Sequence, residues 1–426
     1  MTSEQTALEI NKKLQTYQDK EEYNSYQEEL GFSKELNILR NDFYYKMIEK
    51  ESSWLIDFIY KPLDVMSGDA YTAREIDEYR TFYLVIDGMG KGLSASLTAM
   101  LISAFINHLI DKMKMHDSFD LNILIRESLE YIQPILLDEE ALAIDYILIN
   151  NYYLSMEYAK FSMPATLLQT DSGEIIKIKS NNPPMNKYQN KYLISAYNIK
   201  NISKFLFYSD GLVENTTCID EKPYADFIQE DFSNSFTKED LKERIFEKIK
   251  VQEDDLTLIF INKLPSFKNA AHKKEFESSL KTLEEANAWY EKLFEDLSQN
   301  TKATAQADLV FAELFMNAYE HGNLGMNASL KHTLIENDTY IERLIELSEN
   351  CDKKIVVQLK KITYANSNYI LTKITDEGIG FDTQILSKIF RNAQAFNGRG
   401  VFVSRKNSLG IYYNSQGNSV LFIHKI

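Results

Sequence analysis

The stretch FYLVIDGMGKGLSASLTAMLISAFINHLI, residues 82–110, decides how the first half of the chain folds. Its apolar opening, residues 82–86, predicts a buried strand, and a single carboxylate, Asp87, stands where that strand ends. Small residues then lead into a long apolar run that predicts a helix packed closely on the sheet. Between them lie three glycines, which allow a tight turn that aims Asp87 and a backbone carbonyl at one point: Gly88, Gly90 and Gly92.

Glycine is scarce in the rest of the chain, which makes its positions informative. Only 15 of 426 residues are glycine, about half the usual share of roughly 7%. Glycine is kept where the backbone needs positive φ or must approach a ligand closely, so glycine-bearing segments are the candidate sites. Those segments hold Gly68, Gly88, Gly90, Gly92, Gly211, Gly322, Gly378, Gly380, Gly398 and Gly400.

The composition excludes several classes of protein. A chain of 426 residues with 44% hydrophobic and 26% charged residues is expected to be globular, with two or three domains. No secretory signal and no membrane-spanning apolar run is expected, so no membrane partner is predicted. Two cysteines far apart predict a reducing, cytoplasmic location. The net charge of -16 disfavours nucleic acid as the main partner, because phosphate contacts need cationic patches.

The fold class is predicted to be α+β, with an N-terminal helix and two larger domains. The helix-prone N-terminal part has the spacing of a signalling helix or short coiled coil, and a solvated amphipathic helix packed on its own domain is an equally open interpretation. A polar stretch containing Pro265 is interpreted as the linker. The predicted boundaries are 1–50 for the helix, 51–264 for the first domain, 265–274 for the linker and 275–426 for the second domain.

Acidic residues beside apolar strands recur in the first domain. Each alone is more often a turn or cap residue, and it is their order and spacing together that predict a site. Carboxylates at the ends of neighbouring strands converge, and they would repel each other strongly without a cation. With oxygen ligands alone the expected ions are magnesium or manganese, and two such ions can activate water and clamp a phosphoryl group. The residues are Asp69, Asp87, Asp210 and the pair Asp254 and Asp255.

In this order, SGDAY, LVIDGMGKGLSAS, FLFYSDGLVE and DDLTLIFI resemble the bacterial metal-dependent serine/threonine phosphatases, whose members include the stage II sporulation phosphatase. The resemblance covers residues 55–262 and implies an α-β-β-α sandwich with a two-metal centre between two sheets. Asp255 can take the place of Asp254 in this alignment of motifs. The implied catalytic and metal-binding residues are Asp69, Asp87, Asp210 and Asp254, with the carbonyl of Gly88 as a further metal ligand.

The second domain has a constellation of its own. Two helical runs, 275–297 and 302–322, precede two strands, and the polar run 327–354 is interpreted as a helical insertion or lid. The end of the second run, ELFMNAYEHG, places polar residues at spacings of four and three, on one helix face: Glu313, Asn317 and Glu320 with His321. A later strand ends in Asp376, and four glycines follow at two turns, the second of which is expected to open a helix suited to phosphates: Gly378, Gly380, Gly398 and Gly400.

Together these features resemble the ATPase fold of histidine kinases, gyrase and anti-sigma serine kinases (the GHKL fold), and best the anti-sigma branch. The resemblance covers residues 275–426 and implies an α/β sandwich that binds ATP with Mg²⁺. It implies that Asn317 holds the magnesium, that Glu313 orients or deprotonates the attacking hydroxyl, and that Asp376 bonds the adenine amino group. The four glycines would shape the nucleotide pocket.

Two domains with opposite chemistry predict a partner-switching regulator. One would remove phosphate from Ser or Thr of a small, STAS-like antagonist protein and the other would restore it; a sigma factor or an anti-sigma factor is a further expected partner, and a homodimer is an expected assembly. Three hypotheses stay open: a bifunctional phosphatase–kinase, a phosphatase whose second domain only docks a partner, and a non-catalytic scaffold. The intact acidic set disfavours the scaffold, and Glu313 favours the bifunctional enzyme.

Overall fold

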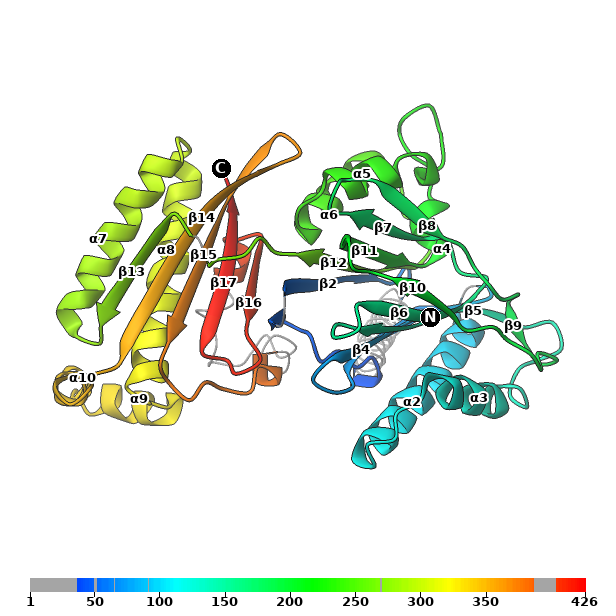
Figure 1. Ribbon diagram of the computed structural model, residues 1–426, viewed down its shortest axis with the longest axis horizontal. Helices are drawn as coiled ribbons and strands as arrows, with labels where there is room; N and C mark the ends of the chain where they lie inside the picture. The colour runs from blue at the N-terminus through cyan, green and yellow to red at the C-terminus, as the bar shows by residue number, and fades with distance from the viewer. Residues whose placement is uncertain (1–36, 50–51, 65, 91, 269, 387–403) are drawn as a thin grey trace, which may run out of the picture.

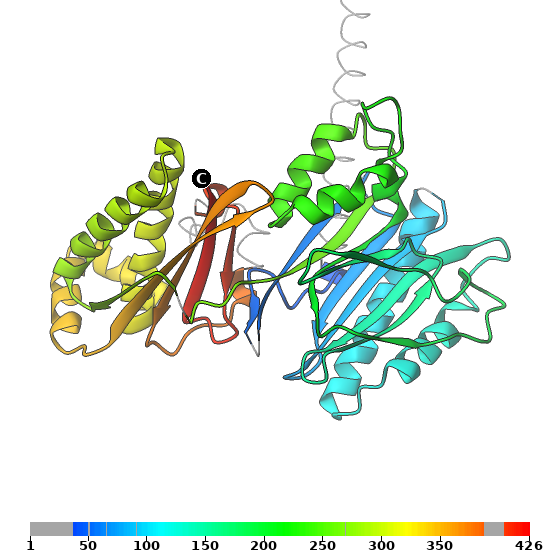
Figure 2. The ribbon, with the colours of Figure 1, turned by 45° about the horizontal axis from the view of Figure 1, so that its top comes forward.

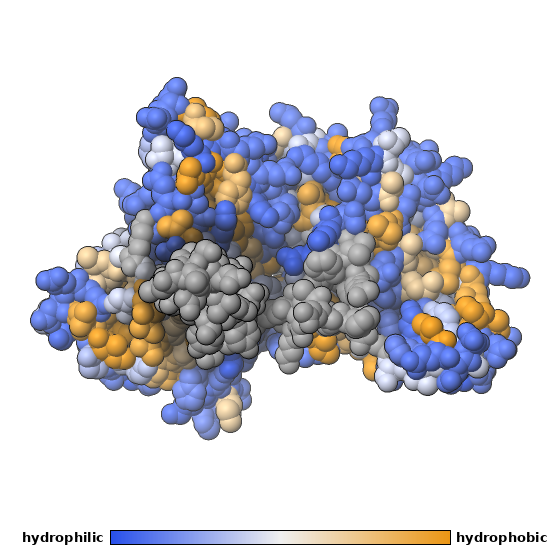
Figure 3. All heavy atoms as spheres, turned by 180° about the vertical axis from the view of Figure 1, so that it is seen from behind, coloured by the Kyte–Doolittle hydropathy of each residue, from blue (hydrophilic) through white to orange (hydrophobic). Residues whose placement is uncertain are grey.

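The computed structural model describes residues 37–426 apart from 50–51, 65, 91, 269 and 387–403 (Figure 1). It contains an N-terminal unit, residues 37–264, and a C-terminal unit, residues 272–426, side by side (Figures 1 and 2). Seen from behind, most of the described surface is hydrophilic, and apolar side chains gather in a few limited groups (Figure 3). Such a surface agrees with the globular protein predicted from composition.

Two antiparallel sheets face each other in the N-terminal unit. The first has the order β1 (Met47–Glu49), β2 (Ser53–Lys61), β12 (Leu256–Lys263), β11 (Ile202–Tyr208), β7 (Thr166–Thr170), β8 (Ile175–Ile178). The second has the order β10 (Ser195–Asn198), β6 (Ser155–Phe161), β5 (Ala141–Asn150), β4 (Arg80–Gly88), β3 (Asp69–Glu75), with β9 (Met185–Asn186) paired to β5. Alternate residues of each strand point inward, so that Tyr83, Val85, Phe205 and Phe207 share the core between the sheets.

Helices cover both outer faces of this pair of sheets (Figure 2). α2 (Leu93–Met115) and α3 (Leu121–Ile132) bury apolar residues against β3, β4 and β5. On the other side lie α4 (Asp210–Val213), the short turn η1 (Tyr224–Asp226), α5 (Ile228–Asn234) and α6 (Lys238–Lys248), packed on β11 and β12. The layers therefore run helix, sheet, sheet, helix, which is the sandwich that the sequence predicted for this part of the chain.

The expectation that no apolar run is long enough to span a membrane was wrong on length and composition. α2 qualifies, with an 18-residue window of mean hydropathy 1.6, but 61% of that window is buried inside the unit. Ala99, Ile102 and Ile106 of this helix are fully buried in the core beneath β4. A core helix that packs on a sheet along its length meets the same criteria as a membrane span. The length and composition of α2 are therefore weak evidence for a membrane span.

Residues 37–49 correct the prediction of an N-terminal helix reaching residue 50. After two helical residues they form an irregular strap, which crosses the edge of β3 and ends in β1. The helix is replaced because the Asn41 side chain accepts the N–H of Phe43 at 2.8 Å and Tyr45 takes a φ of 57°. Residues 1–36, with most of the proposed coiled coil, lie outside the described residues.

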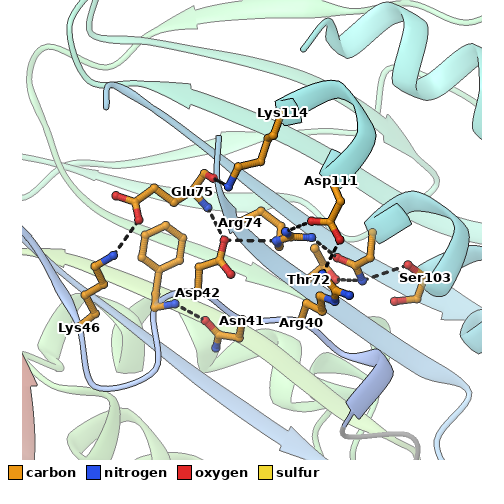
Figure 4. A network of polar contacts seen from close by, with 12 residues as sticks. Arg40, Asn41, Asp42, Lys46, Thr72, Arg74, Glu75, Ser103, Asp111 and Lys114 are labelled. Carbon is orange, nitrogen blue, oxygen red and sulfur yellow. Dashed lines mark hydrogen bonds and ion pairs between the residues drawn. The ribbon is translucent and has the colours of Figure 1, made fainter. Parts of the chain in front are cut away.

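A polar network fastens this strap to β3 and α2 (Figure 4). At its centre is Arg74 of β3, only 4% exposed, which donates to Asp42 of the strap at 3.2 Å and to Asn107 of α2 at 3.0 Å. Arg74 also bonds Asp111 of α2, and Lys46 of the strap bonds Glu75 at 2.7 Å. Because hydrogen bonds to a buried charge are costly to lose, the network fixes the strap on the strand that begins at Asp69.

The C-terminal unit is a two-layer sandwich of helices on one sheet. The antiparallel sheet has the order β13 (His272–Glu277), β14 (Lys354–Tyr364), β15 (Ser367–Asp376), β17 (Ser419–Lys425), β16 (Gly410–Tyr413). Its helices are α7 (Leu280–Leu297), α8 (Thr301–Asn317), the π-helical turn η2 (Ala318–Asn323), α9 (Ala328–Glu336) and α10 (Tyr340–Glu349). Helices α9 and α10 lie within residues 327–354 and confirm that this polar run is helical. The first helix begins at Leu280 rather than 275, because residues 272–277 pair with β14 and start the sheet inside the predicted linker.

The sheet face opposite these helices packs on the N-terminal unit. The shared apolar cluster contains Met47, Leu55, Phe236, Leu264, Tyr369, Leu371, Tyr412, Leu421 and Ile423. Two tyrosine hydroxyls of the sheet reach carboxylates across this contact: Tyr412 donates to the half-buried Asp57 at 2.7 Å, and Tyr369 donates to the buried Asp240 at 3.0 Å. Burial raises the pKa of Asp57. The strap joins the same contact, since the carbonyl of Tyr45 accepts the N–H of Tyr413 at 2.6 Å.

Replacing Arg74 by Met should destabilise the N-terminal unit by about 3 kcal/mol, because the buried partners Asp42 and Asn107 lose their charged donor. Urea unfolding followed by circular dichroism measures the change, and limited proteolysis should cut the strap faster. Arg126→Met is the matched control: Arg126 on α3 has a side chain 54% exposed and pairs with Glu130 at 3.8 Å, so its loss should change stability by less than about 1 kcal/mol. Equal effects of the two variants would contradict the role given to Arg74.

Candidate functional site

Two of the predicted aspartates lie directly opposite each other on neighbouring strands. Asp69 begins β3, Asp87 is near the end of β4, and the antiparallel register pairs the two residues. Asp69 is only 2% exposed. Like charges at directly opposite positions of a sheet destabilise it, so this register demands a compensating group at the same place.

The other two aspartates come from the facing sheet. Asp210 follows β11 as the first residue of α4, and Asp254 lies just before β12, the strand paired with β11. The two turns approach so closely that a Cβ atom at Gly211 would lie 2.0 Å from the carbonyl oxygen of Asp255. A glycine after Asp210 is therefore required, and it brings the two acidic turns together.

Electrostatics shows that the four side chains share one place. Burial, followed by the nearby charges of Asp69, Asp210 and Asp254, raises the pKa of Asp87 to about 10. Burial also raises the pKa of Asp69 well above its usual range, and Ser209 opposes the rise by donating to its Oδ2 at 2.6 Å. Asp87 thus lies within reach of the charges of the other three carboxylates, and such an anionic cluster favours a bound cation.

Residues 77–263 match the family model of stage II sporulation protein E, SpoIIE. This part of the chain is a SpoIIE-type phosphatase domain. Among curated proteins, the phosphoserine phosphatase RsbP of Bacillus subtilis is 26% identical over 209 residues, which are 47% of this chain and 48% of RsbP. The chain thus spans about half the length of the curated relative that it matches.

Solved structures similar to the chain include the RsbU and RsbW domains of Rv1364c from Mycobacterium tuberculosis, with a TM-score of 0.44 and 13% identity over 88% of this chain and 94% of that one. The SiaA PP2C domain of Pseudomonas aeruginosa has a TM-score of 0.46 and 16% identity over 57% of this chain and 98% of its own. RsbX in complex with magnesium has a TM-score of 0.39 and 18% identity over 51% of this chain and 99% of its own.

The acidic cluster of the SpoIIE-type domain fits hard divalent cations. Its donors are carboxylate and carbonyl oxygens, the ligands that magnesium and manganese prefer. One oxygen of Asp87, Oδ2, is buried without a hydrogen-bond partner, as expected of an atom reserved for a cation. Among the described residues no three carboxylate, histidine or cysteine side chains are as close as the ligands of a single ion.

The turn between Asp87 and α2 has the geometry that its glycines predicted. Gly90 and Gly92 have φ values of 87° and 88°, which other residues rarely adopt. Gly88 is needed for space, because a Cβ atom there would lie 3.1 Å from the carbonyl oxygen of Ala95 and 3.2 Å from that of Gly68. The small residue Ala95 thus lets α2 start directly against the acidic cluster.

In the C-terminal unit, the predicted polar face of α8 meets the end of β15. Asn317 and Glu313 contact each other, with Nδ2 and Oε1 3.4 Å apart. Both Glu313 and Asp376 are near enough to Tyr413 to raise the pKa of its hydroxyl, after the larger effect of burial. The structure therefore brings Glu313, Asn317 and Asp376 into one region beside β16.

Gly322 and Gly378 allow the close approach around Asp376. A Cβ atom at Gly322 would lie 2.4 Å from Cγ of Asp376, and one at Gly378 would lie 2.3 Å from the carbonyl oxygen of Gly322. Asp376 accepts the N–H of Gly378 at 2.8 Å, and burial raises its pKa to about 6. Gly322 was recognised in the sequence only as part of a glycine-bearing segment, and its direct packing on Asp376 was missed.

The other residues predicted for this region make different contacts or lie outside the described residues. Glu320 is fully buried and bonded to Lys331 of α9 at 2.6 Å, so it fastens the helical insertion. Gly380 has a φ of 76° and packs against Gln416. Gly398 and Gly400, and the helix they were expected to open, lie outside the described residues.

Replacing Asp87 by Asn should stabilise the metal-free protein at pH 8 while abolishing its stabilisation by Mn²⁺. The carboxyl of Asp87 has a folded-state pKa of about 10 against an ordinary 3.8, so without metal its contribution to stability is full below about pH 4 and is lost as pH rises toward 10. The amide removes this loss, which is at most about 6 kcal/mol at pH 8, at about 1.4 kcal/mol for each pH unit above the ordinary pKa.

Thermal unfolding at pH 6 and pH 8, in chelator and in Mn²⁺, measures both effects. Asp138→Asn is the control and should retain the response to Mn²⁺, because the Asp138 side chain is 69% exposed and paired with Lys187. A variant at Asp87 that Mn²⁺ stabilises as strongly as the wild type would contradict the assignment.

Proposed function

We propose that the chain is a partner-switching regulator whose SpoIIE-type domain removes phosphate from serine or threonine of a small, STAS-like antagonist protein. The observation that carries the proposal is the convergence of four aspartates from four strand ends of two facing sheets. The match to the SpoIIE family model and to a phosphoserine phosphatase supports the same reaction class. The residues proposed to act are Asp69, Asp87, Asp210 and Asp254, with the carbonyl of Gly88.

These residues would hold two Mn²⁺ or Mg²⁺ ions. When bound, the ions supply a nucleophile at neutral pH and neutralise charge on the phosphoryl oxygens. Asp87 lies between Asp69 on its own sheet and the two acidic turns of the other sheet, and would be one of the ligands of these ions. Ser209 orients the carboxylate of Asp69 through its 2.6 Å hydrogen bond. The contribution of the protein is thus to hold the carboxylates at fixed positions, although their like charges repel each other.

For the C-terminal unit we propose ATP binding with Mg²⁺ and phosphorylation of the same antagonist. Asn317 would hold the magnesium, Glu313 would orient or deprotonate the attacking hydroxyl, and Asp376 would accept a hydrogen bond from the adenine amino group. The proximity of these three side chains supports the assignment, and Gly378, Gly380, Gly398 and Gly400 would shape the pocket. The alternative is a docking module for the antagonist, a sigma factor or an anti-sigma factor. A cytoplasmic setting and a homodimer belong to the same proposal.

Substituting Ala for Gly322 should lower ATP affinity at least about tenfold, because the new Cβ atom must displace the Asp376 carboxylate. Binding is measured by calorimetry in Mg²⁺. Gly325→Ala is the control: its Cβ atom meets nothing within 4 Å, although its φ is 66°, so it should cost about 1 kcal/mol of stability and leave affinity nearly unchanged. Equal affinities of the two variants would remove Asp376 from the nucleotide pocket.

Opposed activities should separate in two variants incubated with antagonist, ATP and Mg²⁺. Asp210→Asn should leave the antagonist phosphorylated because only removal is blocked, and Asn317→Ala should leave it dephosphorylated because the nucleotide's magnesium ligand is gone. Mass spectrometry of the antagonist gives the readout. Glu313→Ala should still bind ATP but transfer no phosphate. If the Asp210 variant binds ATP and never phosphorylates a bound antagonist, the docking-module alternative replaces the kinase.

A further inference from the structure

Asp255 has an arrangement different from that of its neighbour Asp254. One carboxylate oxygen of Asp255 accepts the N–H of Leu63 at 2.7 Å, and the other accepts the N–H of Gly68 at 2.6 Å. Leu63 lies just after the end of β2 and Gly68 directly before β3, in the loop 62–68, of which residue 65 is outside the described residues. A single side chain therefore bridges the start and the end of the segment that leads into Asp69.

The bridge continues to the backbone beside Asp87. The carbonyl of Gly68 accepts the N–H of Gly88 at 3.0 Å. The space around this contact is filled, because a Cβ atom at Gly68 would lie 3.3 Å from Cβ of Ala95 and 3.5 Å from Oδ2 of Asp255. Moving the Asp255 carboxylate would consequently move Gly68, and Gly68 is bonded both to Asp69 through the chain and to Gly88 through its carbonyl.

Asp254 is directed elsewhere. Its charge is among those that raise the pKa of Asp87, and its Oδ1 accepts the N–H of Asp255 at 2.8 Å. Both residues precede β12, and Asp255 lies near enough to Asp69 for its charge to raise the pKa of that carboxyl, but the two oxygens of Asp255 bond the loop amides. The sequence had left either acid free to take the ligand position.

We propose that Asp255 is a positioning residue of the metal centre: its carboxylate clamps the loop 62–68 and thereby sets the positions of Asp69 and of the Gly88 carbonyl. The inference rests on the proposed phosphatase function for its consequence, but the clamp itself is a property of the metal-free protein. It works together with Ser209, which fixes the carboxylate of Asp69 and accepts the N–H of Thr257 at 3.1 Å. The loop and the side chain that follows it are thus held by separate bonds.

Hydrogen exchange in chelator tests the clamp without any enzymatic activity. The amides of Leu63 and Gly68 should be protected in the metal-free wild type. Asp255→Asn should accelerate their exchange at least about tenfold, because an amide offers one acceptor oxygen and one donor where the carboxylate offers two acceptors. Asp254→Asn should leave their exchange unchanged. Wild-type amides that exchange freely in chelator and become protected only with Mn²⁺ would overturn the proposal, whatever the variants do.

Manganese affinity and turnover of a phosphoserine peptide separate a positioning residue from a ligand. Asp255→Asn should bind Mn²⁺ about 10–100-fold more weakly, and its lost turnover should return as Mn²⁺ is raised, because all the ligands are still present. Asp254→Asn should not recover at any Mn²⁺ concentration. If Asp255→Asn fails to recover while its loop amides exchange at the wild-type rate, Asp255 is a ligand and the proposal is wrong. If the wild type shows protected amides but no phosphatase activity, the clamp stands and the proposed function fails.

Discussion

Mutual repulsion of carboxylates is the constraint on which the N-terminal unit depends. The register of β3 and β4 sets Asp69 opposite Asp87, and the facing sheet adds Asp210 and Asp254. Burial is the largest cause of the raised pKa of Asp87, and the charges of Asp69, Asp210 and Asp254 add to it. The scaffold must therefore be strong enough to hold an arrangement that is unfavourable without a cation, as is common at functional sites.

The scaffold meets this demand by joining β3 to its surroundings at both ends. At one end Asp255 and Ser209 hold the loop and the carboxylate that begin the strand. At the other end Arg74 fastens β3 to the strap and to α2. A single strand thus connects the acidic cluster with the strap.

The strap is also hydrogen-bonded to the C-terminal unit, and so it contributes to the contact between the two units. Tyr45 accepts the N–H of Tyr413 on β16, and Tyr412 of the same strand reaches Asp57 of β2. The open face of the C-terminal sheet is therefore covered from within the chain. Since Tyr413 of β16 lies near Glu313 and Asp376, this strand contacts both the strap and the proposed nucleotide region.

The sequence by itself determined the order of layers, the helical insertion and the convergence of the acids. Strand ends marked by Asp-Gly turns have few possible geometries, and glycine is kept only where a side chain does not fit, as Gly211 shows. Tertiary structure alone decided three points: that Asp255 bonds the amides of Leu63 and Gly68, that residues 39–49 form a strap, and that α2 is a core helix. Each depends on a partner distant in the chain, such as Gly68 for Asp255 or Arg74 for Asp42. The periodicity of apolar residues along the chain does not identify such partners, because it indicates which residues prefer burial and not which residues they contact.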